Sequence, residues 1–347
     1  MYAHSSRPAI SPINGVTRRK LILLCVLLVA LGAFVLATRG PATPKPNPPG
    51  TFSFAVLGDA PYYFWEDLQY SLVLQELEAN DLSLVIQVGD IFWRPCTDAL
   101  YERSRDWYNG LRHPVIFTPG DNEWSDCWEP RSGGYAPLER LDRLREIFYS
   151  DPARSMGSNP LTLESQAGDE DFGEYVENAR WRYGAIVFAT VHLIGSWNGR
   201  VQFDGRTSED DRGSIERTAA ATAWMRETFE LARSSQTNAV VLAFHADPNF
   251  EEPEHDRYRR TFEPFLEALE EEIEAFGRPV LIVHGDNHDY LVDHPLVRRT
   301  TGQRLENLTR MQVPGSPRVG WVRVTVNPDA VDPFAFESNV VPVWKYW

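Results

Sequence analysis

The chain repeats one local pattern, a short apolar run that ends in glycine followed directly by an aspartate. The pattern occurs in "VLGDAPYY" (56–63), "QVGDIFW" (87–93), "FTPGDNEW" (117–124) and "VHGDNHDY" (283–290). An uninterrupted apolar run predicts a strand that is buried on both faces, as in a parallel sheet covered by helices. The glycine allows a sharp turn, so that the carboxylate points away from the strand end. The repeats therefore indicate an α/β fold with acidic side chains gathered at one edge of its sheets.

Helical spacing between these runs supports the same fold class. In residues 66–80, Leu68, Leu72, Val73 and Leu77 recur at the interval of an amphipathic helix. Strands are predicted at 52–57, 82–88, 114–118, 183–195, 238–244, 279–284 and 320–327, the last of them half-exposed. Helices are predicted at 66–80, 101–111, 137–149, 214–235 and 260–277. This alternation of strands and helices indicates a layered α/β sandwich.

The N-terminal region departs from the rest of the chain. Residues 1–20 are basic, and residues 21–38 are apolar without a single charge. Eighteen such residues in a helix span about 27 Å, enough to cross the hydrocarbon core of a bilayer. Either this segment is a transmembrane anchor that stays in place, or it is a signal peptide cleaved after Ala37. The proline-rich residues 39–51 then form a linker to a domain at 52–347.

Basic residues before an apolar span stay in the cytoplasm, so the domain is expected on the other side of the membrane, in the periplasm or outside the cell. The formal net charge is −15, and residues 1–38 hold four basic and no acidic side chains, which leaves −19 on the rest. So acidic a domain is not expected to bind nucleic acid, which requires a basic groove. A small anionic substrate held by metal ions remains compatible with this charge.

Five predicted strand ends carry side chains that bind divalent cations. The residues are Asp59, Asp90, Asp121 with Asn122, His245, and finally His284, Asp286 and His288. A single Gly-Asp after a strand is most often a turn or a helix cap. A pair of divalent ions about 3.5–4 Å apart, however, needs several acids and imidazoles with one shared carboxylate. The recurrence at one type of position favours a metal centre.

The order of these motifs resembles that of the calcineurin-like metallophosphoesterase superfamily, which includes the purple acid phosphatases. The resemblance covers residues 52 to about 292, and "GDxPY", "TPGDNEW" and "HGDNH" resemble a bacterial branch of that superfamily. It implies an α/β/β/α sandwich with a binuclear metal site in the loops at the C-terminal ends of the strands. It also implies hydrolysis of phosphate monoesters or diesters by attack of a metal-bound hydroxide on a small phosphorylated substrate.

The resemblance assigns the metal ligands position by position. Asp59 and His288 would hold the first ion, and Asp90 would bridge the two ions. The ligands of the second ion would be Asp121, His245 and Asp286. Four carboxylates and two imidazoles form a hard donor set, which favours Mn, Fe or Mg and leaves Zn possible.

The sequence departs from the family pattern at two positions. Pro61 stands where a histidine is expected, and Asn122 stands where the family has its catalytic histidine. Asparagine can donate a hydrogen bond to a phosphoryl oxygen but cannot transfer a proton. His192 and His284 are therefore further catalytic candidates for the missing proton donor. A shift of one residue, with Asn122 as the ligand in place of Asp121, is a second way to align the third motif.

Cys96 and Cys127 follow the second and third acidic motifs. In an oxidising compartment they are candidates for a disulfide that ties these two loops together, whereas free thiols are the alternative.

Three functions fit the sequence. The first is an exported, metal-dependent phosphoesterase. The second is a metallophosphoesterase-like binding or sensing module with weakened catalysis, suggested by the changes at Pro61 and Asn122. The third is a secreted glycosidase, suggested by the acidic charge and the 11 tryptophans. Chelation separates the third from the first, because a glycosidase that works with two carboxylates does not need a transition metal.

Overall fold

The computed structural model describes residues 46–342. The basic N-terminus (1–20), the apolar segment (21–38) and most of the linker lie outside the described residues. Within residues 46–342, no helix is both long and apolar enough to span a bilayer.

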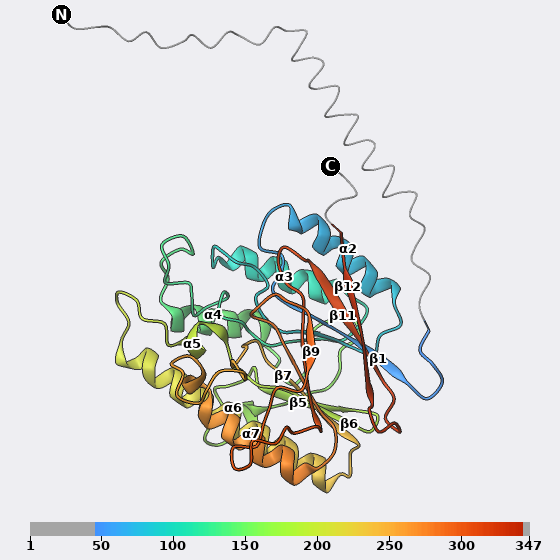
Figure 1. The fold of residues 1–347 in the computed structure, drawn as a ribbon. Coiled ribbons are helices and arrows are strands. Elements are labelled where there is room, and N and C mark those ends of the chain that lie inside the picture. Colours follow the sequence, from blue (N-terminus) through green and yellow to red (C-terminus); the bar gives the residue numbers. More distant parts are fainter. Residues whose placement is uncertain (1–45, 343–347) are drawn as a thin grey trace, which may run out of the picture. The chain divides into compact units, whose positions relative to one another are not determined.

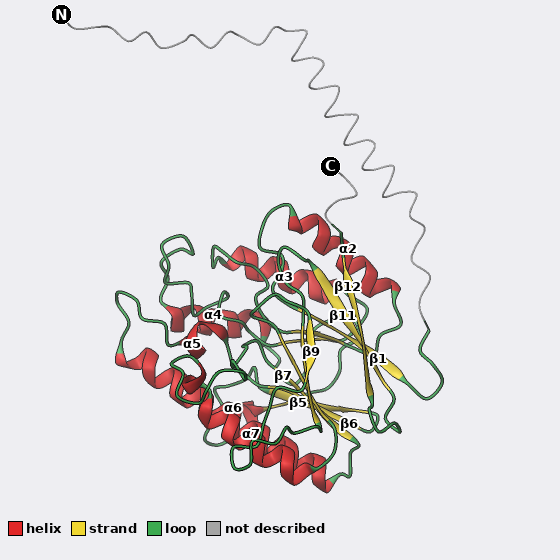
Figure 2. Ribbon diagram, viewed as in Figure 1, coloured by secondary structure: helices red, strands yellow, loops and turns green. Residues whose placement is uncertain are grey.

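Two sheets form the centre of the domain (Figures 1 and 2). In order across the first sheet, its five strands are β12 (Phe334–Val340), β11 (Gly320–Val326), β1 (Phe52–Leu57), β2 (Val85–Gln87) and β3 (Val115–Phe117). Strands β1, β2 and β3 run parallel, whereas β11 is antiparallel to β1. The carboxyl ends of β1, β2 and β3 therefore point to the same edge of this sheet.

The second sheet has seven strands. In spatial order they are β4 (Glu164–Ser165), β5 (Ala179–Tyr183), β6 (Ile186–Thr190), β7 (Ala239–Ala243), β8 (Val280–His284), β10 (Leu308–Gln312) and β9 (Leu291–Asp293). Its central strands β6, β7, β8 and β10 are parallel, with Ala243 opposite Val283 and His284 opposite Gln312. A second set of strand ends thus meets at one edge.

Helices cover the outer face of each sheet. The helices α2 (Glu66–Ala79), α3 (Asp98–Gly110) and α4 (Pro137–Phe148) share an apolar cluster with the five-stranded sheet. The helices α6 (Ser208–Ser234) and α7 (Glu263–Phe276) share another with the seven-stranded sheet. Short helical turns occur at η1 (Gln166–Gly168), α5 (Gly195–Gly199) and η2 (Arg259–Thr261).

The inner faces of the two sheets pack on each other. Phe54 of β1 meets Phe188 of β6 edge to face, with ring centroids 5.3 Å apart, and both belong to one buried cluster that draws on both sheets. The layers are therefore helix, sheet, sheet, helix, and the predicted α/β/β/α sandwich is confirmed.

Three predicted elements need correction. The strand predicted at 183–195 is the shorter β6, Ile186–Thr190, and it pairs with the preceding antiparallel β5, because Gly184 turns the chain between them with a φ of +58°. Helix α6 begins at Ser208, earlier than predicted, because Thr207 and Asp210 form a capping box there. Strand β11 is buried rather than half-exposed, because it lies between β1 and β12 beneath an apolar helical layer.

Candidate metal centre

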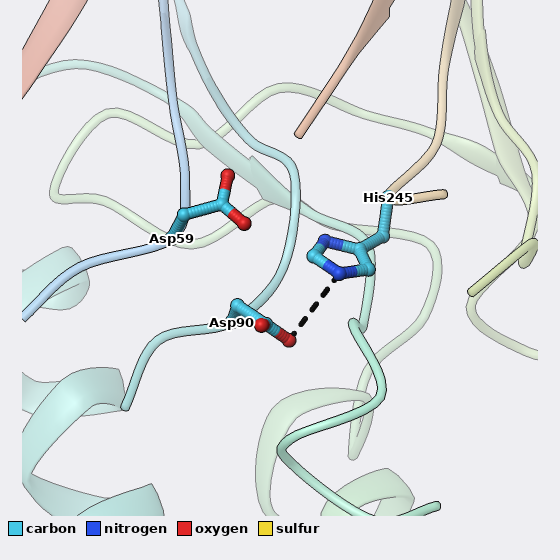
Figure 3. A group of neighbouring side chains, drawn as sticks. All are labelled: Asp59, Asp90 and His245. Atoms are coloured by element: carbon cyan, nitrogen blue, oxygen red, sulfur yellow. Dashed lines mark ion pairs between the residues drawn. The ribbon is translucent and has the colours of Figure 1, made fainter. Parts of the chain in front are cut away.

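The ends of five parallel strands from both sheets meet at one site, which Figure 3 shows in part. The strands β1, β2, β3, β7 and β8 are each followed within a few residues by one of Asp59, Asp90, Asp121, His245 and Asp286. Ligand atoms of Asp59, Asp90 and His245 lie within 4.8 Å of one another, and so do those of Asp121, His245 and Asp286. The second group is the set expected for the second ion, and His245 is common to both groups.

The backbone at these positions is held in an unusual conformation. Asp59, Asp90, Asp286 and His288 have φ values of 53°, 57°, 77° and 63°. Residues with a side chain seldom adopt positive φ, and such strain is concentrated at functional sites. A Cβ at Gly120 or Gly285 would collide with the carboxylates of Asp90 and Asp59, respectively. The glycines of the motifs thus allow sharp turns, and they also leave room for a carboxylate from a neighbouring strand end to lie close to the backbone.

The two histidines of the site are oriented in the same way. His245 Nδ1 donates to the carbonyl of Val88 over 2.8 Å, and His288 Nδ1 donates to the carbonyl of Ser316 over 2.8 Å. Because a carbonyl only accepts, Nδ1 of each ring carries a proton, and Nε2 is the nitrogen left to face a metal ion. His288 Nε2 lies 3.7 Å from Asp59 Oδ1, which places this ring beside the first group. A histidine that binds a metal ion usually donates its other ring N–H to a backbone carbonyl, a carboxylate or water in this way.

Asn122 lies against Asp90 rather than in place of Asp121. Its Nδ2 donates to Asp90 Oδ2 over 2.6 Å, and its backbone N–H donates to Asp90 Oδ1 over 3.1 Å. Asp121 Oδ1 instead lies 2.9 Å from His245 Nε2. The geometry therefore favours the ungapped alignment, with Asp121 in the cluster.

Tyr62 also contacts this carboxylate. Its hydroxyl donates to Asp90 Oδ2 over 2.5 Å and lies 3.0 Å from Asn122 Nδ2, and its ring meets the His288 ring edge on. Burial, together with the neighbouring Asp90 charge, raises the pKa of Tyr62 well above its ordinary value. Tyr62 and Asn122 thus form a pair of neutral hydrogen-bond donors beside Asp90.

The remaining carboxylates are held by partners that the sequence did not reveal. Ser196 Oγ lies 2.8 Å from Asp121 Oδ2 and 2.8 Å from Asp126 Oδ2, and its one hydroxyl proton can be donated to either oxygen. Tyr258 donates to Asp286 Oδ2 over 3.1 Å, and the backbone N–H of Asp247 donates to the same oxygen over 3.0 Å. Tyr258 comes from a segment without a strand-end pattern, whereas Ser196 follows Gly195 at the end of the strand predicted at 183–195 but is neither an acid nor an imidazole.

Two buried glutamates join the loops of the site. Glu123 accepts hydrogen bonds from the backbone N–H groups of Ile91 and Gly120, which connects the loops after β2 and β3. Glu66 accepts from the backbone N–H of Tyr62 and from the hydroxyl of Ser316. Both side chains are inaccessible to solvent, so they fix the loops and do not face a substrate.

The clustered acids oppose one another's ionisation. Burial raises the pKa of Asp59 and of Asp90, and burial together with the charge of Asp121 raises the pKa of Asp286 to about 7. Burial alone would lower the pKa of His245, but Asp90 and Asp121 hold it well above its usual range. A bound cation would stabilise all of these groups in their ligating forms.

The buried ligand atoms of the site and their chemical type both suit divalent cations. Within residues 46–342, buried Asp59 Oδ2 has no hydrogen-bond partner, and buried Asp121 Oδ1 and His245 Nε2 have none except each other, 2.9 Å apart, although all three belong to one small cluster. Buried polar atoms normally have partners, so an orphaned group of this kind indicates an ion or water. The donor set is carboxylate oxygen with imidazole nitrogen, which suits divalent metals.

The two other catalytic candidates have different surroundings. His192 is buried with Nδ1 2.6 Å from Glu177 Oε1, and its ring meets Trp124 edge on. His284 stacks on Phe244, and burial lowers its pKa to about 3. Within the described residues, neither imidazole has a hydrogen bond or ion pair to the clustered carboxylates.

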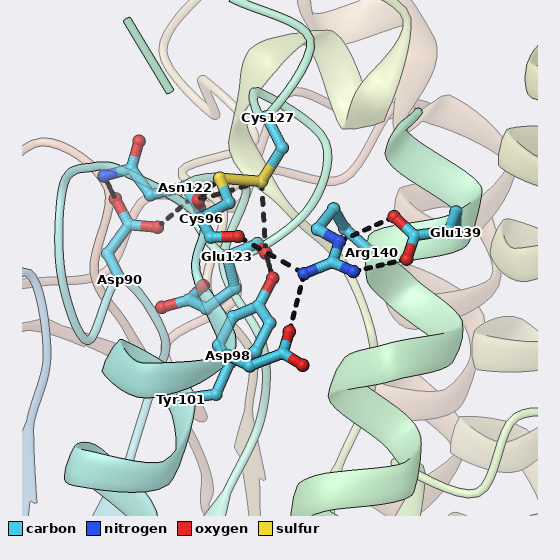
Figure 4. Close-up of a disulfide and its surroundings, with 9 residues drawn as sticks. All are labelled: Asp90, Cys96, Asp98, Tyr101, Asn122, Glu123, Cys127, Glu139 and Arg140. Carbon is cyan, nitrogen blue, oxygen red and sulfur yellow. Dashed lines mark hydrogen bonds and ion pairs between the residues drawn. A yellow bond between two sulfur atoms is a disulfide. The ribbon is translucent and has the colours of Figure 1, made fainter. Parts of the chain in front are cut away.

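A disulfide joins Cys96 and Cys127 next to the site (Figure 4). Both sulfur atoms are buried against the backbone carbonyl of Asn122. The bond therefore links the loop after β2, which carries Asp90, to the loop after β3, which carries Asp121.

Comparison with solved structures identifies the fold. The structure of PhoD matches with a TM-score of 0.53 and 14% sequence identity, over 85% of this chain and 70% of that chain. At this identity the likeness shows the fold alone. The domain therefore has the α/β/β/α sandwich that the resemblance to the calcineurin-like superfamily implied.

Two further structures match more distantly. Phosphopantetheinyl hydrolase PptH from Mycobacterium tuberculosis has a TM-score of 0.36 and 15% identity, over 77% of this chain and 90% of that chain. A protein serine/threonine phosphatase from Saccharomyces cerevisiae, with similarity to human phosphatase PP5, has a TM-score of 0.34 and 9% identity, over 84% of this chain and 80% of that chain. No family model and no curated protein matches the sequence.

Proposed function

We propose that the protein is a metal-dependent phosphoesterase that hydrolyses phosphate monoesters or diesters. The convergence of Asp59, Asp90, Asp121, His245 and Asp286 at the strand ends of a metallophosphoesterase-type sandwich carries this proposal. The buried ligand atoms that have no hydrogen-bond partner outside this group support it. His288, beside Asp59, completes the proposed ligand set for two divalent ions.

The chemistry that divalent ions supply at such a site is Lewis acidity toward phosphoryl oxygens and activation of water. The chain itself holds the ligands and orients both imidazoles through Val88 and Ser316. Near Asp90 it offers Tyr62 and Asn122 as neutral donors rather than a titrating acid. We therefore expect a preference for substrates with good leaving groups, because no side chain beside Asp90 would protonate a poor one.

We further propose that the domain lies outside the cytoplasm. The disulfide between Cys96 and Cys127 supports this location, because such bonds persist in oxidising compartments. The apolar residues 21–38, preceded by Arg18, Arg19 and Lys20, support an anchor whose basic side stays in the cytoplasm. Secretion after cleavage remains the alternative outcome, and the N-terminal sequence of the mature protein decides between them.

The test uses the full chain, purified in mild detergent without chelator. Bound metals are quantified, and hydrolysis of p-nitrophenyl phosphate and its bis-ester is measured before and after chelation, with Asp90→Asn as control. About two metal ions per chain, with activity lost on chelation and in Asp90→Asn, is the expected result. Bound metal without turnover would favour a binding module, and activity on glycosides that survives chelation would favour a glycosidase.

The dependence of rate on leaving group provides a second test. Aryl phosphates of increasing phenol pKa are expected to react progressively more slowly. An equal rate across the series would show that an acid elsewhere in the site protonates the leaving group.

A further inference from the structure

A strained turn begins at Ser196, at the edge of the site. Ser196, Trp197 and Asn198 have φ values of 50°, 59° and 54° with ψ values of 46°, 42° and 43°. They are three consecutive left-handed residues with side chains. Each such residue costs about 1–2 kcal/mol relative to the right-handed conformation. Strain of this kind persists only where the surrounding structure fixes it, and it is concentrated where function needs it.

A buried network holds the turn in place. The Arg217 guanidinium donates to the side-chain and backbone oxygens of Asn198 over 2.8 and 2.7 Å. Asn198 Nδ2 donates to Thr218 Oγ1 over 2.8 Å, and the Ser214 hydroxyl donates to the Asn198 carbonyl over 2.8 Å. All four of these residues are buried. Helix α6, which supplies Arg217, Thr218 and Ser214, therefore fixes the position of Trp197 between Ser196 and Asn198.

The guanidinium of Arg257 lies over the ring of Trp197, with 4.8 Å between its Cζ atom and the ring centroid. Arg257 is exposed and has no ion pair to any residue from 46 to 342. Arg259, two residues later, is paired instead: it donates to the carbonyls of Phe250 and Glu252 over 2.6 and 2.7 Å and to Glu263 over 2.7 Å. The contacts of Arg259 thus fix the loop that carries Arg257, and the exposed side chain of Arg257 extends from a backbone that is held in place.

The Trp197–Arg257 pair adjoins residues that contact Asp121 and Asp286. Ser196, next to Trp197, donates to Asp121, and Tyr258, next to Arg257, donates to Asp286. A Cβ on Gly195 would come within 2.6 Å of Asp286 Oδ1 and 2.7 Å of Asp121 Oδ1, so the turn runs directly against these carboxylates. Two segments far apart in sequence thus bring one aromatic ring and one cation to the same edge of the site.

The pairing leaves the donors of Arg257 available. An arginine that stacks on an aromatic face is held by cation–π attraction and keeps its N–H groups free in the guanidinium plane. Carboxylates are abundant in this acidic domain and pair with many of its other arginines, such as Arg145 with Glu177. A guanidinium that is positioned by tryptophan instead is suited to a bidentate contact with an external anion.

We propose that Arg257, positioned by Trp197, binds an anionic oxygen of the phosphate group of the substrate at the Asp121–Asp286 side of the site. This assignment rests on the proposed phosphoesterase function. Arg257 is then a substrate-binding residue, and Trp197 and the left-handed turn position it.

The test compares Arg257→Ala, Arg257→Lys and Arg260→Ala with the wild type, all loaded with metal. Arg260 is the matched control, because it is exposed and lies three positions after Arg257. Like Arg257, it forms no ion pair with any residue from 46 to 342. In Arg257→Ala, the KM for p-nitrophenyl phosphate and the inhibition constant of orthophosphate should rise about ten- to hundredfold, the loss expected for one charge-assisted contact. The metal content should stay unchanged, and kcat should change less than KM.

Two readouts distinguish binding from a structural role. Arg257→Lys keeps the charge but loses the planar fork, so its KM should lie between those of wild type and Arg257→Ala. Free guanidinium ion should lower the raised KM of Arg257→Ala and should leave Arg260→Ala unchanged. A KM and an inhibition constant within twofold of wild type in Arg257→Ala would overturn the assignment while the proposed function stands.

Calorimetric binding of orthophosphate to the metal-loaded protein separates the two proposals if the wild type shows no turnover. Binding that weakens in Arg257→Ala and not in Arg260→Ala would support the anion site without hydrolysis. Equal binding in all variants, or none in the wild type, would overturn it.

Discussion

His245, at the end of β7, donates a hydrogen bond of 2.8 Å from Nδ1 to the carbonyl of Val88, just after β2. The two strands belong to different sheets, so this bond crosses the sandwich. It fixes the tautomer of the ring and presents Nε2 to Asp90 and Asp121, at 3.4 and 2.9 Å. The backbone oxygen of Val88, next to a strand of one sheet, thus orients His245, a proposed metal ligand next to a strand of the other sheet.

Replacing His245 by Gln is expected to weaken metal binding at least about tenfold, because ligands and their oriented partners carry that much affinity. Metal content after dialysis, measured by mass spectrometry, checks this expectation. The control is His255→Gln, which changes an exposed histidine outside the cluster. Equal metal retention in both variants would contradict the assignment of His245.

Gly195→Ala should abolish activity without unfolding the protein. The new Cβ would lie 2.6 Å from Asp286 Oδ1 and 2.7 Å from Asp121 Oδ1 and would displace them. Gly110→Ala is the control, because no atom beyond its chain neighbours and the backbone of its own helix lies within 4 Å of its Cβ position. Far-UV circular dichroism and metal content measure the outcome. A Gly195→Ala variant with normal metal content and rate would show that the turn tolerates a side chain.

Tyr62→Phe removes the hydroxyl that donates to Asp90. By analogy with the partners of other metal ligands, we expect kcat to fall or metal affinity to weaken about ten- to hundredfold. Tyr63→Phe, at the exposed neighbouring ring, should leave both unchanged. Steady-state kinetics with metal titration distinguish the two variants, and indistinguishable curves would remove Tyr62 from the site.

Reducing the disulfide should destabilise the domain. Cys96 and Cys127 are 31 residues apart in sequence, and a loop of about 30 residues corresponds to about 3–4 kcal/mol of unfolding free energy in the chain-entropy model. Urea unfolding with and without a reductant measures the difference, and the double variant with serine at both positions should match the reduced protein. A midpoint insensitive to reductant in a verified disulfide-bonded sample would contradict this expectation.

Acid should destabilise the protein through His192. Burial lowers the pKa of His192 to about 4 from an ordinary 6.5, with Glu177, Arg145 and Arg217 as its charged neighbours. Between these values the unfolded chain binds a proton that the native state does not, so stability falls as pH falls from 6.5 to 4. The full effect of such a shift is about 3 kcal/mol.

Urea unfolding of wild type and His192→Gln across this pH range tests the sign. The variant should lose less stability on acidification, because it lacks the titrating ring. His255→Gln, which alters an exposed histidine, should follow the wild type. Parallel curves for wild type and His192→Gln would show that His192 does not carry the effect.

The strand-end motifs could be predicted from the sequence, because each depends only on a few consecutive residues. An apolar run, a glycine and an acid in direct succession specify a buried strand, a sharp turn and an outward carboxylate, as at Asp59 and Asp90. Strand β10 was not predicted, because its Arg310 is only 1% exposed yet polar. Arg310 is compensated by Asp293 and Glu251, which lie elsewhere in the chain.

The sequence by itself determined the layered α/β class and the position of six candidate ligands at strand ends. Both depend on steric preferences and on the spacing of apolar residues, which act over a few neighbouring residues. Only the tertiary structure decided that Asn122 lies on Asp90, that His192 pairs with Glu177, and that Arg257 stacks on Trp197. These contacts join residues that are 15 to 60 positions apart in the sequence. Their geometry depends on how the two sheets and their helices pack, which no short stretch of sequence specifies.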